Sequence, residues 1–373
     1  MNSKERMKLA MKGVKPDRVP IMCQIATGHM YKNSGIDPID FWYTSKGFSQ
    51  ANINISTKYK FDGILLNFPG RNPEIKNQIM GIEKTNDGHI ITWLSGGKTF
   101  VPPDEDPYPM GKKLCKNAIS IDEFDENTLK LFKSKSDIPD YYFDIINCIM
   151  RSDISKELSI HGEIGTTFEN FLLQFGSYEG GFLALLDDPD RSKEIMKKIN
   201  SSVIIWALAQ CSRGIDALKL SSPLAGSGFI SRKMYEEFVL PFEKEVIERV
   251  KEYYDIPCYI HTCGKIGDRL DLIVETGVDG IECLDPSPLG DVDLEKAIEK
   301  IGDKVFIKGN LDSVNELLGH SPENVKKIAK DRIEIGKKCS KGYILSSACS
   351  VSPKVPSENI LALYDAVEQY GWY

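Results

Sequence analysis

PCYIHTCGKIGDRLDLIVETGVDGIEC, residues 257–283, contains the pattern that decides the fold. A short apolar run, Pro257–His261, is followed by an amphipathic stretch, Asp268–Glu275, and then by a second apolar run, Gly280–Cys283. Runs this short and this apolar are typical of parallel strands that helices cover on both faces. The stretch therefore predicts one strand–helix–strand unit of an α/β protein.

The same unit recurs along the chain. Eight apolar runs read as strands: Arg18–Cys23, Gly63–Phe68, Leu158–Gly162, Ala217–Ser221, Pro257–His261, Gly280–Cys283, Val305–Gly309 and Gly342–Ser346. The stretches with helical periodicity are Tyr235–Tyr254, with a break expected at Pro241, and Asp268–Glu275, Leu294–Lys300, Pro322–Cys339 and Pro356–Tyr370. Strands that alternate with helices in this number favour a (β/α)₈ TIM barrel; a doubly wound open sheet is the alternative.

Residues 75–115 do not follow this alternation. Asn86-Asp87-Gly88 is a turn signal between two strand-like pieces, and a loop rich in proline and acidic residues follows. We expect one barrel domain over residues 1–373, with a β-hairpin and loop inserted after its second strand, at about 75–140. Insertions at that end of a barrel commonly cover the substrate, so Trp93 and Tyr108 are candidate substrate contacts. The alternative is simple packing of the hairpin.

The charge balance limits the class of partner. Of 373 residues, 47 are Lys or Arg and 54 are Asp or Glu, which gives a net charge of −7. An acidic chain argues against nucleic acid, because phosphate backbones attract basic surfaces. No apolar stretch approaches the ~20 residues that span a bilayer, and the charged N-terminus lacks the apolar region of a signal peptide. We therefore expect a cytoplasmic protein with no membrane partner.

The nine scattered cysteines include a metal-binding pattern. His261 and Cys263 stand two residues apart where one strand ends, and Cys349 follows the last strand. Because the ends of parallel barrel strands converge at one mouth, these three side chains can meet. Two thiolates and one imidazole favour Zn²⁺ over Mg²⁺ or Ca²⁺, and three protein ligands are typical of a catalytic site. An H-x-C pair alone is weak, since most such residues belong to an ordinary core.

The strand at 280–283 offers further ligands. Glu282 and Cys283 should point to opposite sides, so that only one faces the barrel interior, and Asp285 lies just beyond the strand. Glu282 or Asp285 is the expected additional ligand, and Cys283 is expected to be a core thiol. Glu163 and Asp285 are candidate catalytic residues, because hydrolysis at a metal needs a nearby general base.

Polar residues at the other strand ends are candidate substrate contacts. They are Asn67, His161, Glu163, Asn310 and, in the first loop, His29. For His161, Glu163 and Asn310 the alternative is a hydrogen bond that caps a turn.

Four segments together resemble the uroporphyrinogen decarboxylase superfamily. SKERMKLAMKGVKPDRVPIM (3–22) is similar to its N-terminal helix and first strand, and GEIGTTFENFLLQFG (162–176) to the region after its third strand. VDGIECLDPSPLGDVDLEKAIEKIGDKVFIKGNLD (278–312) is similar to its sixth and seventh barrel units, and GYILSSACSVSPKVPSENILALYDAVEQYG (342–371) to its last unit. The resemblance implies a (β/α)₈ barrel.

The resemblance also distinguishes two branches. The decarboxylases carry an arginine-rich segment after the first strand, whereas residues 22–30 here, MCQIATGHM, contain no arginine, which disfavours a uroporphyrinogen decarboxylase-like lyase. The other branch comprises zinc-dependent methyltransferases of corrinoid pathways, and His261, Cys263 and Cys349 match its H-x-C and distant Cys positions. That branch implies Zn²⁺ and a corrinoid (cobalamin) carried by a separate corrinoid protein.

Two roles exist within that branch. One enzyme type moves a methyl group from a methylated corrinoid protein to a thiol such as coenzyme M. The other takes it from a methoxy compound, such as an aryl methyl ether, and delivers it to Co(I) of the corrinoid protein. The predicted insertion favours the second role, because extra walls suit a small methylated substrate. The thiol role is the alternative, and a homodimer is left open.

Overall fold

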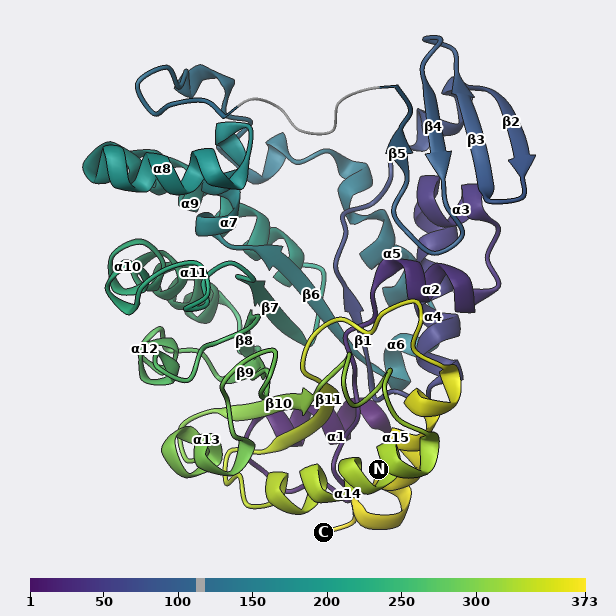
Figure 1. The fold of residues 1–373 in the computed structure, drawn as a ribbon, viewed down its shortest axis with the longest axis vertical. Helices are drawn as coiled ribbons and strands as arrows, with labels where there is room; N and C mark the ends of the chain where they lie inside the picture. Colours follow the sequence, from purple (N-terminus) through teal and green to yellow (C-terminus); the bar gives the residue numbers. More distant parts are fainter. Residues whose placement is uncertain (112–117) are drawn as a thin grey trace.

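A curved sheet of parallel strands forms the centre of the computed structural model, which describes residues 1–111 and 118–373 (Figure 1). Within these residues the sheet has seven strands. In spatial order they are β1 Gly63–Leu66, β6 Ser159–Gly165, β7 Ala217–Ser221, β8 Cys258–Thr262, β9 Gly280–Cys283, β10 Phe306–Leu311 and β11 Tyr343–Ser347. Each neighbouring pair is parallel, and each strand coincides within a few residues with one predicted from the sequence.

Residues 20–22 occupy the eighth position of the ring, between β11 and β1. Ile21 forms a parallel bridge with Leu345 of β11, and its carbonyl accepts a hydrogen bond from the Asp62 backbone N–H at 2.8 Å. Pro20 has no N–H, so this segment can form only isolated bridges instead of a regular ladder. The (β/α)₈ barrel predicted from the sequence is confirmed.

Helices surround the sheet in Figure 1. They are α1 Ser3–Met11, α2 Thr27–Ser34, α3 Pro38–Tyr43, α4 Ser45–Lys58, α5 Asp144–Met150, α6 Ile154–Glu157, α7 Thr167–Leu172, α8 Tyr178–Asp187, α9 Pro189–Cys211, α10 Arg232–Phe238, α11 Leu240–Tyr253, α12 Leu270–Glu275, α13 Leu294–Ile301, α14 Pro322–Gly336 and α15 Ser357–Tyr370. Short 3₁₀ turns are η1 Pro73–Gln78, η2 Glu126–Thr128, η3 Lys135–Asp137, η4 Asp140–Phe143 and η5 Leu173–Phe175. The predicted break at Pro241 is confirmed, because α11 begins there after α10 has ended. None of the helices in the described ranges is long and apolar enough to cross a membrane.

The insertion after β1 is a separate antiparallel sheet, which stands apart from the barrel in Figure 1. Its strands are β2 Ile79–Thr85, β3 Gly88–Trp93, β4 Lys98–Val101 and β5 Tyr108–Pro109. The hairpin expected at Asn86-Asp87-Gly88 is present as β2 and β3, and two further short strands extend it. The loop between β4 and β5 reaches back to α2, where the Thr27 hydroxyl donates to Asp106 Oδ1 at 2.7 Å.

Candidate metal centre

Three soft ligand atoms meet at the carboxyl ends of the barrel strands. His261 lies on β8, Cys263 follows that strand, and Cys349 follows β11. One ligand atom from each lies within 4.8 Å of the others. The distance is 3.2 Å from His261 Nε2 to Cys263 Sγ and 3.4 Å from Cys263 Sγ to Cys349 Sγ. The structure therefore brings together the three residues that the sequence singled out.

The donor set suits a zinc ion. His261 is buried, whereas Cys263 and Cys349 are half-buried and border the opening of the barrel. Hydrogen bonds from Cys263, then from Cys283 and His261, lower the pKa of Cys349 despite its partial burial, so this residue presents a thiolate. Imidazole and thiolate are preferred zinc ligands, and three of them leave a position for a substrate atom.

Glu282 lies behind His261, on the side away from the thiols. Its Oε2 is 3.1 Å from His261 Nδ1, and this contact holds the ring with Nε2 facing Cys263. Burial raises the pKa of Glu282, but Lys219 and Lys308 outweigh this and hold it well below its usual range. The side chain is thus an ionised partner of a ligand, the kind that fixes ring orientation in metal sites. This position differs from the direct ligation expected for Glu282.

Two buried lysines, which the sequence reasoning missed, hold that carboxylate. Lys219 Nζ on β7 is 3.1 Å from Glu282 Oε2 and 3.5 Å from Glu163 Oε2, and Lys308 Nζ on β10 contacts Glu282 Oε1. Both lysines are almost fully buried. A lysine inside an apolar strand, as in ALKLS and VFIKG, was the available signal, because a charge is almost never buried without a partner.

Asp285 and Cys283 form a second set that shares Cys263. Ligand atoms of Cys263, Cys283 and Asp285 also lie within 4.8 Å of one another. Asp285 Oδ2 accepts hydrogen bonds from the Gly264 backbone at 2.6 Å and from Cys283 Sγ at 3.2 Å. Burial raises the pKa of Asp285, although the hydrogen bond from Gly264 opposes the rise. Asp285 and Cys283 therefore border the three candidate ligands.

His161 and Glu163 lie on β6 and not at its end. The sequence predicted that this strand stops near Gly162, but it continues to Gly165, so His161 is fully buried inside the barrel. Its ring nitrogens lie 3.0 Å from Ser159 Oγ and 3.0 Å from Tyr259 OH. Burial, with Lys308 nearby, lowers the pKa of His161 to about 3, so the ring is neutral. The predicted exposure of His161 at the mouth is wrong, whereas Glu163 keeps some exposure.

The other candidate substrate contacts are mostly engaged in packing. His29 is buried between Tyr59 OH at 2.7 Å and the Ser352 carbonyl at 2.9 Å. Asn310 is buried and donates to the Leu284 carbonyl at 2.9 Å. Both residues therefore hydrogen-bond to parts of the chain that are distant in sequence, and neither bond caps a turn.

Asn67, Trp93 and Tyr108 differ in their surroundings. Asn67 lies just past β1, and its Oδ1 is buried without a hydrogen-bond partner among the described residues. Trp93 donates to Thr99 Oγ1 at 2.8 Å within the inserted sheet. Tyr108 is exposed and pairs with Phe100, with ring centroids 5.5 Å apart. Packing of the inserted sheet accounts for both aromatic residues.

The remaining described thiols belong to neither group of candidate ligand atoms. Cys23, Cys211, Cys258 and Cys339 are buried in the apolar core, and Cys148 is exposed. Cys115 lies outside the described residues.

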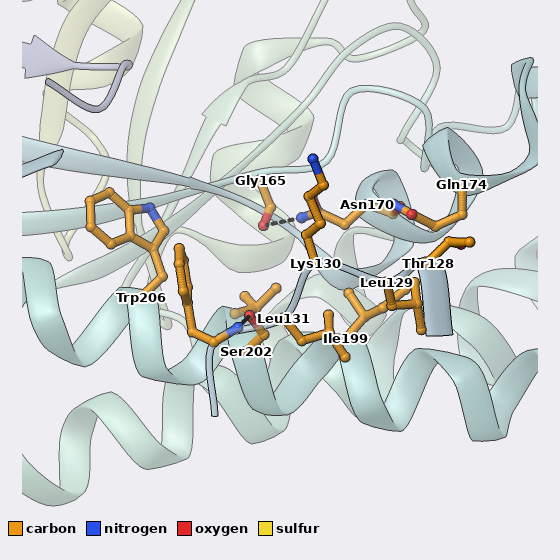
Figure 2. Close-up of a pocket in the computed structure, with 12 residues that line it drawn as sticks. Thr128, Leu129, Lys130, Leu131, Gly165, Asn170, Gln174, Ile199, Ser202 and Trp206 are labelled. Atoms are coloured by element: carbon orange, nitrogen blue, oxygen red, sulfur yellow. Dashed lines mark hydrogen bonds between the residues drawn. The ribbon is translucent and has the colours of Figure 1, made fainter. Parts of the chain in front are cut away.

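A pocket of about 520 Å³ lies outside the barrel interior, between α7, α9 and residues 128–132 (Figure 2). Figure 2 shows Asn170 donating to the Gly165 carbonyl, at 3.1 Å, across its upper side. None of its lining residues in the described chain is His, Cys, Asp or Glu. The described lining of this pocket therefore offers no metal-ligating side chain of these types, unlike the group at the barrel mouth.

Relatives at the sequence level carry two kinds of name. A methylcobamide:CoM methyltransferase (MtbA) of Methanosarcina acetivorans is 26% identical over 224 residues, which is 60% of this chain and 62% of that protein. A uroporphyrinogen decarboxylase of Legionella pneumophila is 26% identical over 238 residues, which is 61% of this chain and 63% of that protein. The matches thus span less than two thirds of the length of these relatives.

Solved structures share the fold over a longer span. A methyltransferase from Methanosarcina mazei has a TM-score of 0.72 and 16% sequence identity, and the match covers 99% of both chains. A B12-independent methionine synthase from Shewanella has a TM-score of 0.51 at 11% identity, over 87% of both chains. The sequence profile of the uroporphyrinogen decarboxylase (URO-D) family matches residues 113–370, more than half of the chain, and the chain therefore belongs to that family.

Proposed function

We propose that this chain is a zinc-dependent methyltransferase that works with a corrinoid protein and transfers a methyl group from the methylated corrinoid to a small thiol. The observation that carries the proposal is the group of His261, Cys263 and Cys349 ligand atoms, within 4.8 Å at the barrel mouth. The methylcobamide and CoM in the names of two relatives support this pair of substrates.

The residues around the candidate centre have different roles in this proposal. When bound, zinc supplies a Lewis acid that keeps a thiol as its thiolate near neutral pH. Glu282, held by Lys219 and Lys308, orients His261. Asp285, beside the ligands, is the candidate acceptor of the proton that the substrate thiol loses.

Glu163 is the carboxylate that faces the mouth from β6. Its side chain is 14% exposed, and its Oε2 has no hydrogen-bond donor among the described residues, although Lys219 Nζ lies 3.5 Å away. Glu163 therefore offers a substrate a hydrogen-bond acceptor, while the fully buried Lys219 balances its charge from behind. We assign Glu163 to substrate positioning, a role that the proposed thiol substrate requires from at least one residue outside the metal ligands.

Demethylation of a methoxy compound is the second candidate. It is favoured by the inserted sheet, whose β4–β5 loop contacts α2, the helix that carries His29, through Thr27 and Asp106. The names of the relatives favour the thiol acceptor, so the methoxy reaction ranks behind it.

The test is metal analysis combined with a methyl-transfer assay. We expect about one zinc per chain, and transfer from methylcobalamin to coenzyme M followed by the loss of the cobalt–methyl absorbance. Cys349→Ser should lose both zinc and transfer, whereas Cys211→Ser, a buried thiol at the end of α9, should keep both. Transfer from a panel of methoxyarenes to cob(I)alamin, without transfer to coenzyme M, would replace the thiol reaction with the methoxy reaction. Purified chain that contains no transition metal would overturn both.

A further inference from the structure

Two buried oxygen atoms on neighbouring strands have no hydrogen-bond donor among the residues that the structure describes. They are Oδ1 of Asn67, which directly follows β1, and Oε2 of Glu163 on β6. A buried acceptor without a donor costs about 1–3 kcal/mol, and native proteins retain few such atoms. Two of them at one barrel mouth indicate a place where a ligand supplies the donor.

The register of the sheet places these two side chains next to each other. Leu66 pairs with Gly162 where β1 ends, and the next residue on each strand is Asn67 or Glu163. His161, two residues before Glu163, is fully buried inside the barrel. Because side chains alternate along a strand, Glu163 and its neighbour Asn67 face the interior as well. Neighbouring strands lie about 4.8 Å apart, so one donor group can reach both oxygens.

Lys219 lies behind Glu163 but does not satisfy its carboxylate. Lys219 Nζ is 3.5 Å from Glu163 Oε2, whereas it lies 2.6 Å from Gln24 Oε1 and 3.1 Å from Glu282 Oε2. The shorter contacts of this ammonium group are therefore with other residues. Lys219 is fully buried, while the side chain of Glu163 is 14% exposed. The barrel opening thus presents the carboxylate and not the ammonium group.

The pair lies on the opposite part of the ring from the candidate metal ligands. Asn67 and Glu163 belong to the adjoining strands β1 and β6, whereas His261 lies on β8 and Cys349 follows β11. A thiol whose sulfur is held between His261 and Cys349 can extend its other end across the mouth. That end then meets the two unpartnered oxygens.

The chemistry of the two oxygens limits what the substrate carries at that end. Carboxylate and amide oxygens accept hydrogen bonds from N–H and O–H groups. An ammonium group forms a charge-assisted bond with a carboxylate, which is roughly twice as strong as a bond between neutral groups. A sulfonate or carboxylate has no proton to donate near neutral pH, and its charge is repelled by Glu163.

We infer that Asn67 and Glu163 form a subsite for a hydrogen-bond donor, so that the substrate is a small thiol with an ammonium group at the end opposite its sulfur. The inference rests on the proposed function, whose thiol acceptor it narrows. A hydroxyl group suits the subsite less well than an ammonium group, and a sulfonate suits it least. Coenzyme M ends in a sulfonate, so an amino thiol of the same length should be the better substrate.

Three thiols of equal chain length test the subsite. Cysteamine, 2-mercaptoethanol and coenzyme M end in an ammonium, a hydroxyl and a sulfonate group. Cobalt(II) in place of zinc gives an absorbance spectrum that changes when a thiol binds, so dissociation constants can be measured without a corrinoid. We expect cysteamine to bind at least about tenfold more tightly than coenzyme M, with 2-mercaptoethanol between them.

Variants separate the subsite from the differing acidities of the three thiols, which are the same for every variant. Glu163→Gln removes the charge and should reduce the preference for cysteamine over coenzyme M by about tenfold. Asn67→Leu removes the second acceptor and should reduce this preference by about fivefold. The matched control is Glu243→Gln, because Glu243 is also buried with an unpartnered oxygen but bonds to Tyr235 of α10, outside the barrel. It should keep the wild-type preference.

The outcomes distinguish the inference from the proposed function. Equal affinity of the wild type for all three thiols, or tighter binding of coenzyme M than of cysteamine, overturns the inference and leaves the proposed function intact. A preference for cysteamine that both Glu163→Gln and Asn67→Leu retain in full does the same. A wild-type chain that binds neither cobalt nor zinc overturns both.

Discussion

Replacing Glu282 by glutamine tests whether the buried charges support the metal-binding histidine. Glu282 Oε2 lies 3.1 Å from both His261 Nδ1 and Lys219 Nζ, and Oε1 contacts Lys308 Nζ. These four side chains are at most 2% exposed, so water does not screen the interaction. The amide oxygen of glutamine can still accept a hydrogen bond from His261, but it removes the negative charge between two ammonium groups.

The expected effect on stability follows from the burial. Removing one partner of a buried ion pair costs about 3–5 kcal/mol, because the remaining charge is left without compensation. Scaled by the unfolding entropy of a chain of 373 residues, this lowers the melting temperature by about 4–6 °C. Zinc affinity should fall by about tenfold, because a neutral amide orients the imidazole less firmly and makes it a weaker donor.

Differential scanning calorimetry and chelator competition measure these two effects. The matched control is the double variant Glu282→Gln/Lys308→Met, which removes the uncompensated ammonium group and should regain part of the lost stability without regaining zinc affinity. The reasoning is refuted if Glu282→Gln melts at the wild-type temperature and binds zinc as tightly as the wild type. Loss of stability without any loss of zinc affinity would refute the orienting role alone.

Three further predictions concern the barrel as a whole. Burial raises the pKa of Glu243 from 4.5 to about 7, and nearby Glu169 adds to the rise. The native state therefore resists ionisation of this carboxyl, whereas the unfolded state does not. The free energy of unfolding should fall by about 3 kcal/mol as the pH rises from 4.5 to 7. Glu243→Gln should flatten that part of a melting temperature–pH profile, and an unchanged profile would contradict the assignment. Asp62→Asn removes a fully buried carboxylate that is bonded to two buried arginines. It should lower the free energy of unfolding in urea by about 3–5 kcal/mol, and a loss below about 1 kcal/mol would contradict this prediction. Gly342→Ala should lower the free energy of unfolding by more than the roughly 1–3 kcal/mol of a strained backbone. The reason is that Gly342 has a φ of +106°, and the new Cβ would also lie 1.9 Å from the Ala10 carbonyl oxygen. A variant as stable as the wild type would show that this contact relaxes freely.

The strands of the barrel could be predicted because each is an apolar run bounded by glycine, proline or aspartate. What could not be predicted is where a strand ends relative to the mouth. Residues 163–165 continue β6 past Gly162, and this error of three residues moved His161 from the expected mouth into the interior. The segment around Ile21 was predicted as a strand from its composition, but it forms only isolated bridges because its proline prevents a regular ladder.

The convergence of the three candidate ligand residues could be predicted for a different reason. His261, Cys263 and Cys349 carry chemistry that few other roles require, and each follows or ends an apolar run, so their convergence needed only the barrel topology. Cys283 was assigned to the core because alternation along a strand is the rule. The rule failed where two consecutive residues adopt positive φ. Residues such as cysteine and leucine rarely adopt this conformation, so the sequence does not predict it.

The interior of the barrel beneath the metal centre is therefore charged where other barrels are packed with branched apolar side chains. Lys219 and Lys308 oppose Glu163 and Glu282, so the charges balance within the barrel and no lysine is left without a carboxylate. Burying these ions does not favour folding over an apolar core of the same volume, since desolvation offsets most of their attraction. Their placement is explained by the imidazole they support: Glu282 must stay ionised to hold Nδ1, and a buried carboxylate stays ionised only when cations surround it. The chain thus gives up stability at the centre of its barrel to keep one histidine nitrogen directed at Cys263.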